Sequence, residues 1–249
     1  MIAKIVNLML ILADDRIPEK AKDTLEKHGH IIYLITHSIS YPAISGHPDI
    51  FFCTINNHLI VAPNLSEDIK NRLKKFEVSY SAGKKPVGEK YPETAWYNSV
   101  VTANYVIGNT SFMDQHIKDL AGTKEIIHVN QGYTRCNLIP LKNDRFITSD
   151  KGIEKVLLKY GLEVLFVDPE GVLLPGFKNG FIGGTCGVWQ NKIFFIGSLQ
   201  HFSKGQKVRD FICDMEIVEL YDGPLFDGGS LIFIETQSHL KHNKRPLHP

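Results

Sequence analysis

The sequence predicts an α/β protein in which five copies of one strand–strand–helix–strand unit close into a five-fold pseudosymmetric ring, an α/β propeller. The unit recurs at intervals of about 40 to 50 residues, the range of repeat architectures. Each full unit carries an amphipathic helical segment, which the all-strand blades of an ordinary propeller lack. Short polar turns, "INNH", "LKNDR" and "WQNK", occupy the same place in three units. The first strands of the units are expected to converge on an axis, with the helices outside.

The units lie between residues 45 and 236. The first reads "DIFFCTINNHLIVAPN", "LSEDIKNRLKKF" and "EVSY", with Ser66 as the expected helix N-cap. The second begins at "NSVVTANYVIGN", the third at "CNLIPLKNDRFITS" and the fourth at "NGFIGGTCGVWQNKIFFIG". In the third, Asp150 is the expected cap and Gly161 the expected helix end. The fifth is cut short after "FDGGSLIFIE".

Two segments fall outside the repeats. Residues 1–44 read as strand, helix and strand, and are expected to form an extension packed on the edge of the ring. The first strand is not followed by GxGxxG, which argues against a dinucleotide cofactor. Residues 237–249, "QSHLKHNKRPLHP", have the composition of a flexible basic and histidine-rich tail.

Composition narrows the class of partner. The 28 basic and 27 acidic residues give a net charge of +1, which disfavours nucleic acid and membrane surfaces as partners. The four cysteines lie far apart, as in reduced cytoplasmic proteins. Membrane spans, zinc-ligand spacings and phosphate-binding loops are not found in the sequence, so no cofactor or metal is expected. The oligomeric state is left open.

The starts of the first strands supply the candidate site. Aligning the units by their second strands places polar residues at matching points near the axis. The expected set comprises Asp49, Asn98, Cys136, Cys186, His47, Arg135 and Asp227. A thiol, an imidazole, carboxylates and a guanidinium around one cavity suit covalent attack on an amidine carbon. Cys136 and Cys186 are the candidate nucleophiles and His47 the candidate acid or base. Asp49, Asn98, Arg135 and Asp227 are the candidate ligand-binding residues.

Each cysteine also has a structural interpretation. Cys186 follows Gly184 by two residues and so shares its strand face, but a buried strand thiol is more often a core residue. Arg135 would lower the pKa of the Cys136 thiol if both faced the cavity, although adjacent strand residues face opposite ways. Cys53 and Cys213 lie in apolar stretches and are expected in the core.

The repeat pattern and the glycine-rich strand starts "GGTCG" and "FDGGS" resemble the pentein fold of guanidino-group-modifying enzymes, and within it an uncharacterised bacterial family. The resemblance covers roughly residues 45–236. It implies a nucleophilic cysteine after the paired glycines of the last repeat and a histidine ahead of a middle strand. Here Ser230 and Leu231 follow those glycines, and Phe181 and Ile182 precede Cys186.

Three functions are compatible with this pattern. The first is binding of a small polar ligand, an amino acid or guanidino compound, in the central cavity without turnover. The second is a cysteine-dependent hydrolase or amidinotransferase acting on C–N bonds, with its nucleophile relocated to Cys136 or Cys186. The third is a non-catalytic scaffold for a protein partner, with a docking surface formed by Tyr41, Trp96, Tyr97 and Phe177.

Overall fold

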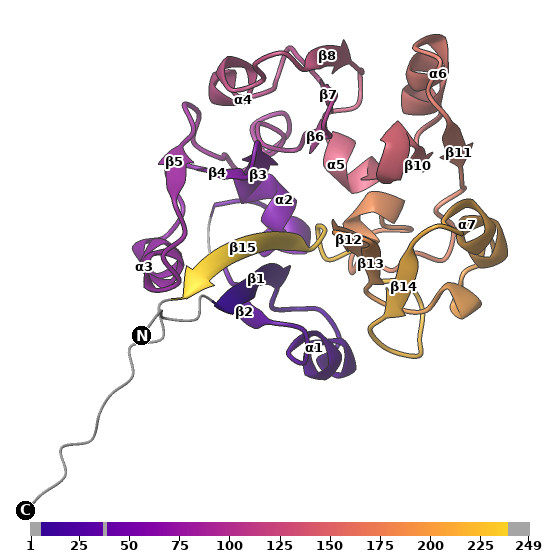
Figure 1. Cartoon of the computed structure of the whole chain (residues 1–249), viewed down its shortest axis with the longest axis horizontal. Helices are drawn as coiled ribbons and strands as arrows, with labels where there is room; N and C mark the ends of the chain where they lie inside the picture. Colours follow the sequence, from indigo (N-terminus) through magenta and orange to yellow (C-terminus); the bar gives the residue numbers. More distant parts are fainter. Residues whose placement is uncertain (1–5, 37–38, 239–249) are drawn as a thin grey trace, which may run out of the picture.

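The predicted five-unit ring is confirmed. The computed structural model describes residues 6–36 and 39–238, and it holds five three-stranded sheets placed around a common centre (Figure 1). In every sheet the second strand is central, antiparallel to the first strand and parallel to the third. The helix of each unit lies on the periphery (Figure 1).

The first four units follow one another along the chain. Unit 1 comprises β3 (Phe52–Ile55), β4 (His58–Val61), α3 (Glu67–Lys75) and β5 (Tyr80–Ala82). Unit 2 comprises β6 (Val100–Val101), β7 (Tyr105–Gly108), α4 (Gln115–Asp119) and β8 (Glu125–His128). Unit 3 comprises β9 (Leu138–Pro140), β10 (Phe146–Thr148), α6 (Lys151–Lys159) and β11 (Val164–Phe166). Unit 4 comprises β12 (Cys186–Trp189), β13 (Lys192–Phe195), α7 (Gly205–Phe211) and β14 (Glu216–Glu219).

The fifth unit is shared between the two ends of the described chain. Its first strand is β15 (Ile232–Ser238), and β1 (Val6–Asp14), α1 (Glu19–Leu25) and β2 (His30–Leu34) complete it. The segment expected as an extension on the edge therefore pairs within the ring. The repeat pattern did not reveal this pairing, because the sequence of the fifth unit is interrupted between its first and second strands. The expected tail falls, from residue 239 onward, outside the described residues.

Local sequence explains the regular elements. Asn56 and Asn57 adopt left-handed backbone angles (φ 52° and 58°), as a two-residue hairpin turn between β3 and β4 requires. Ser66 caps α3, since its hydroxyl accepts from the Ile69 amide at 3.5 Å. Asp150 caps α6 through the Ile153 amide at 2.9 Å, and Gly161 follows that helix with a φ of 74°.

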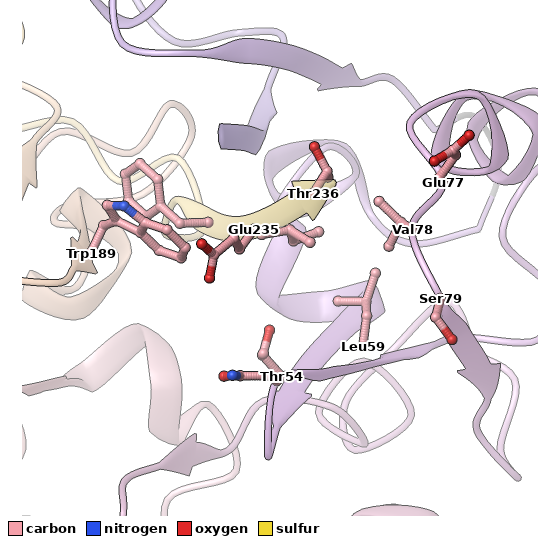
Figure 2. Close-up of a pocket in the computed structure, with 11 residues that line it drawn as sticks. Thr54, Leu59, Glu77, Val78, Ser79, Trp189, Glu235 and Thr236 are labelled. Atoms are coloured by element: carbon pink, nitrogen blue, oxygen red, sulfur yellow. The ribbon is translucent and has the colours of Figure 1, made fainter. Parts of the chain in front are cut away.

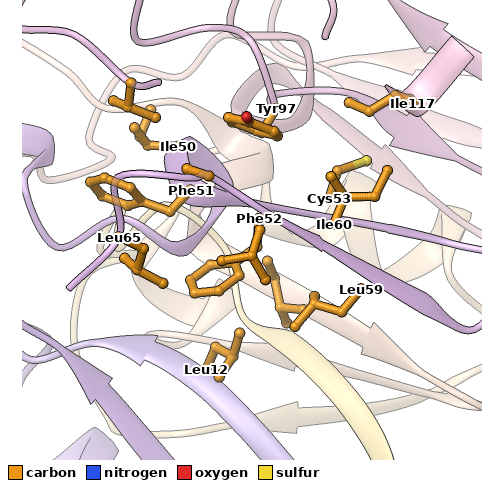
Figure 3. Close-up of a cluster of buried hydrophobic side chains, with 14 of the residues drawn as sticks. Leu12, Ile50, Phe51, Phe52, Cys53, Leu59, Ile60, Leu65, Tyr97 and Ile117 are labelled. Atoms are coloured by element: carbon orange, nitrogen blue, oxygen red, sulfur yellow. The ribbon is translucent and has the colours of Figure 1, made fainter. Parts of the chain in front are cut away.

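The largest hydrophobic cluster joins several units. Figure 3 shows side chains of β3, β4 and the short helix α2 (Pro48–Phe51) meeting Leu12 of β1 and Ile117 of α4. Three further clusters fill the spaces between the remaining sheets and helices. Within the described residues, no helix has the length and apolarity to cross a membrane. The hydrophobic clusters thus hold neighbouring units together and fix the positions of the residues near the ring axis.

Candidate functional site at the ring axis

Short helical turns, rather than strands, hold three of the residues that were expected to open the first strands. Asp49 belongs to α2, Cys136 to α5 (Thr134–Asn137) and Gly184 to the 3-10 turn η3 (Ile182–Thr185). The expectation that these residues open the first strands was therefore wrong by a few residues. A helical turn does not keep the two-residue alternation of a strand, so Cys186 does not share a direction with Gly184.

Asn98 ties three units together beneath the site. Its amide nitrogen donates to the Asp49 carbonyl at 3.2 Å and to the Cys136 sulfur at 3.2 Å. Its amide oxygen accepts from the backbone nitrogens of Arg135 at 2.6 Å and Cys136 at 3.2 Å. Both donors and both acceptor positions of the side chain are therefore used by the protein. The geometry gives Asn98 a positioning role.

The Cys136 thiol is paired with a buried carboxyl group. It donates to Asp49 Oδ2 at 2.9 Å, and Ser230 Oγ lies 3.2 Å from the same oxygen. Burial raises the pKa of Asp49 to about 6. Burial first, and then the charge of Asp49, raise the pKa of Cys136 well above its usual value. The sulfur is accordingly held as a thiol.

Above this layer lies a small cavity at the amino-terminal ends of the first strands. Its volume is about 130 Å³, and its walls include Tyr41, His47, Tyr133, Cys136, Phe181 and Asp227. Most of the wall is aromatic or aliphatic, and the polar or ionisable side chains are those of His47, Cys136, Asn179 and Asp227. Ligand pockets also combine a mostly apolar wall with a few polar groups, although most of them are larger than this cavity.

Asp227 is the carboxylate of this cavity. Its side chain accepts from the backbone nitrogens of Phe181 at 2.8 Å and Gly229 at 3.1 Å. The residue is 1% exposed, and burial raises its pKa. In residues 6–36 and 39–238 it forms no ion pair with a lysine or arginine. The carboxyl group is therefore hydrogen-bonded and forms no ion pair with a lysine or arginine of those residues, and the nearby His47 partly offsets the burial that raises its pKa.

His47 lies on the same cavity, paired with an acid that the sequence pattern did not suggest. Its Nε2 is 3.8 Å from Asp14 Oδ2 at the end of β1, and Asp14 also pairs with Arg16. Its buried Nδ1 has no hydrogen-bond partner among the described residues. Asp14 could have been found only by treating β1 as part of the ring.

Glycines allow the chain to close around Asp227. A Cβ on Gly184 would lie 1.9 Å from Asp227 Oδ1, and one on Gly180 would lie 2.5 Å from the Asp227 Cβ. Neither position could carry a larger residue without displacing the carboxylate. The glycines that precede the first strand of unit 4 thus leave the space that the Asp227 side chain occupies.

The structure separates two of the predicted residues from this cavity. Arg135 instead lines a larger cavity, of about 450 Å³, at the carboxyl-terminal ends of the first strands. Cys186 is fully buried in a hydrophobic cluster, where burial raises its pKa to about 12. The site therefore gathers Cys136, His47 and Asp227, with Asp49 and Asn98 beneath them.

The structure also tests the two cysteines expected in the core and one residue of the expected docking surface. Cys53 is buried in the core as predicted, but Cys213 is exposed, in the turn that follows α7. Tyr97 is 1% exposed and its hydroxyl donates to the Lys85 carbonyl, so it cannot contribute to a docking surface. The described residues hold no group of three or more potential metal ligands.

Comparison with known proteins supports the fold. A protein family described as "Family of unknown function (DUF6873)" matches residues 12–232. No curated protein matches the chain in sequence. The structure is similar to that of a dimethylarginine dimethylaminohydrolase from Pseudomonas aeruginosa in complex with citrulline (TM-score 0.55, 10% identity, 92% of this chain and 100% of that chain).

Two further solved structures extend the likeness. One is an amidinotransferase of saxitoxin biosynthesis from Microseira wollei (TM-score 0.53, 11% identity, 88% of this chain and 90% of that chain). The other is an agmatine deiminase from C. jejuni (TM-score 0.53, 10% identity, 88% of this chain and 89% of that chain). Coverage of nearly the whole chain in each case shows that the complete ring is shared.

Proposed function

Because the chain belongs to DUF6873, a family of unknown function, and has the pentein fold of guanidino-group-modifying enzymes, we propose that it binds a small cationic guanidino or amidine compound at the ring axis. The ligand's planar head enters the small cavity, and the Asp227 carboxylate receives it. The observation that carries the proposal is this buried carboxylate, which lines a cavity and forms no ion pair with a lysine or arginine of the described residues.

Charge favours a cation in this cavity. Removing a carboxylate from water is unfavourable unless hydrogen bonds and an opposite charge compensate it. Two backbone N–H groups supply hydrogen bonds to Asp227, but no lysine or arginine in the described ranges pairs with it. A guanidinium or amidinium group would supply both charge and further donors. The unpartnered Nδ1 of His47 offers another polar contact at the same wall.

Size and wall composition favour a planar head group. A volume of about 130 Å³ equals the liquid volume of about four waters, enough for a carbon atom with its attached nitrogens. Aromatic rings attract cations through their faces, and Tyr41, Tyr133 and Phe181 all line the cavity. Phe177 packs on Tyr41 with 6.2 Å between ring centroids and stands 54% exposed at the mouth. The remainder of a longer ligand would pass this exposed ring.

Ligand titration of the purified protein tests the proposal. Arginine and agmatine are expected to raise the melting temperature and to bind saturably in calorimetry. Asp227→Asn should weaken that binding by about 10- to 100-fold, since a hydrogen bond to a charged group contributes about 1.5 to 3 kcal/mol. Asp222→Asn is the matched control, because Asp222 pairs with His201 at the surface and does not line the cavity.

Citrulline separates charge recognition from shape recognition, because a neutral urea group takes the place of the charged guanidinium of arginine. Citrulline is expected to bind to the natural protein more weakly than arginine does. To the Asp227→Asn variant, citrulline and arginine are expected to bind equally. Absence of any shift with arginine, agmatine and citrulline would contradict the proposal. So would full arginine affinity in the Asp227→Asn variant.

Catalysis by a relocated cysteine is the second candidate function. One observation favours it: Cys136 and His47 line the same cavity. A Cys136 nucleophile would attack the amidine carbon as a thiolate, and His47 would then protonate the leaving amine. The pairing of its thiol with Asp49 opposes ionisation, so a bound ligand would have to change that pairing first.

Thiol labelling distinguishes binding from catalysis. In the folded protein at neutral pH, iodoacetamide is expected to modify exposed Cys213 first and the buried Cys53, Cys136 and Cys186 far more slowly. Peptide mapping by mass spectrometry gives each rate. Faster modification of Cys136 than of Cys213, in the presence or absence of agmatine, would favour the catalytic alternative.

A further inference from the structure

The ring has a second cavity at the opposite ends of its first strands. The small cavity is lined by residues that precede those strands, such as His47 and Asp227. The second cavity, of about 450 Å³, is lined largely by residues at or just beyond the carboxyl-terminal ends of those strands, including Thr102, Pro140 and Trp189. The Asp49, Asn98 and Cys136 layer lies between the two. Neither the proposed function nor the catalytic alternative uses this second cavity.

Arg135 reaches this cavity without a partner. Its Nη1 is buried, and its guanidinium makes no hydrogen bond or ion pair with any residue in the described ranges. The other arginines of those ranges are all engaged. Arg16, Arg145 and Arg209 pair with carboxylates, and Arg72 donates to the Tyr33 carbonyl.

The buried Nη1 of the half-buried Arg135, which has no partner among the described residues, calls for a physical explanation. Buried charged donors are strongly destabilising unless an acceptor or an opposite charge compensates them. Asp49 also lines this cavity, and the charge of Arg135 partly offsets the burial that raises the pKa of Asp49, but the two side chains form no hydrogen bond or ion pair. Asp49 Oδ1 has no partner among the described residues either. The missing acceptor is therefore expected to come from outside the chain.

The rest of the lining favours a small organic anion. Lys124 adds a second positive charge, held by its contacts with the carbonyls of Thr102 at 2.9 Å and Ala103 at 2.7 Å. Trp189 and Phe233 form an apolar wall, with 6.0 Å between their ring centroids. A neighbouring hollow of about 480 Å³ shares Trp189 and leads toward Glu235 and Glu77 (Figure 2). The positive charges of Arg135 and Lys124 thus line the second cavity, whereas the neighbouring hollow carries the negative charges of Glu77 and Glu235.

From this arrangement we propose that the second cavity binds a small carboxylate with an apolar body, with its oxygens on Arg135 and its body against Trp189. The planar fork of a guanidinium matches the two oxygens of a carboxylate, and a lysine cannot reproduce that match. The site is independent of the cation site, because it lies at the other ends of the first strands and takes a ligand of opposite charge.

The two tryptophans of the chain provide an internal reporter. Trp189 lines the cavity, whereas Trp96 does not and its indole donates to the Pro86 carbonyl. In nitrogen-15 NMR spectra of the full-length protein, benzoate is expected to shift the Trp189 indole signal saturably and to leave that of Trp96 unchanged. Benzamide, which has the same shape without the charge, should bind at least about tenfold more weakly, as expected for loss of a charged hydrogen bond.

Variants assign the effect to the guanidinium. Arg135→Gln is expected to weaken benzoate binding at least about tenfold, and Arg135→Lys by less, because it keeps the charge. Arg209→Gln, a surface arginine paired with Glu219, should bind benzoate as the natural protein does. If Arg135→Gln does not fold, Arg135→Lys and the benzoate-to-benzamide ratio in the natural protein decide the question.

The opposite results would overturn the inference. They are no saturable Trp189 shift, equal binding of benzoate and benzamide, unchanged benzoate affinity in a folded Arg135→Gln variant, or binding of inorganic phosphate in place of benzoate. Failure of arginine or agmatine to bind would contradict only the proposed function. The two proposals can therefore fail separately.

Discussion

Asp49→Asn is expected to stabilise the protein at pH 8 by up to about 3 kcal/mol. Burial raises the pKa of Asp49 from 3.8 to about 6, and two pKa units correspond to about 3 kcal/mol. The folded state holds this proton to higher pH than the unfolded state does. The stability from the protonated carboxyl is thus fully present below about pH 4 and lost as pH rises through about 6. Asparagine stays neutral throughout and avoids that loss.

The asparagine keeps the hydrogen bonds that reach Oδ2. Its oxygen can accept from the Cys136 thiol and the Ser230 hydroxyl, as Asp49 Oδ2 does. Its amide nitrogen would replace Oδ1, which is buried without a partner among the described residues, so an unpaired donor there offsets part of the gain. Urea unfolding at pH 8 and pH 4.5 measures the effect, and the gain should shrink at the lower pH. Asp214→Asn is a control of opposite sign, because Arg145 lowers the pKa of that exposed carboxyl. An Asp49→Asn variant that is less stable than the natural protein at pH 8 would contradict this account of the layer.

Gly183→Ala is expected to destabilise the ring by about 3 kcal/mol or more, the upper range for added atoms in a packed core. A Cβ at this position would lie 2.3 Å from the Arg135 carbonyl oxygen and 2.8 Å from the Leu138 nitrogen. Both are backbone atoms, so the clash can be relieved only by moving η3 away from α5. That movement would open the contact between units 3 and 4.

Thermal and urea unfolding of Gly183→Ala measure this effect. Gly152→Ala is the control, because within 4 Å its new Cβ would meet only the carboxylate of Asp150, the cap of the same helix, and no atom of another unit. That control is expected to change stability far less, since alanine also favours the helix in which it lies. A Gly183→Ala variant as stable as the natural protein would show that the two units do not approach as closely as described.

Much of the fold could be predicted because local signals repeat. The polar turns at Asn56–Asn57 and Asn143–Asp144, where left-handed backbone angles occur, and the caps Ser66 and Asp150 mark equivalent points of successive units. The fifth unit was not recognised as complete. Its first strand and its remaining elements lie at opposite ends of the described chain, so β1 has no local sign that it pairs with β15.

The candidate site was predicted in part. His47, Cys136 and Asp227 do share a cavity, because equivalent positions of a closed ring converge. Arg135 and Cys136 are adjacent in sequence yet line opposite cavities, as their consecutive positions in a short helical turn allow. Pairwise geometry such as that of His47 and Asp14 depends on the ring closure that the sequence pattern did not show.

A crystal structure of the protein grown with methylguanidine tests the central claim most directly. We expect density for a planar group in the axial cavity, with its nitrogens against the Asp227 carboxylate and its face toward the aromatic wall of Tyr41 and Phe181. An axial cavity that holds only water at saturating methylguanidine, or density for the ligand elsewhere on the molecule, would contradict it.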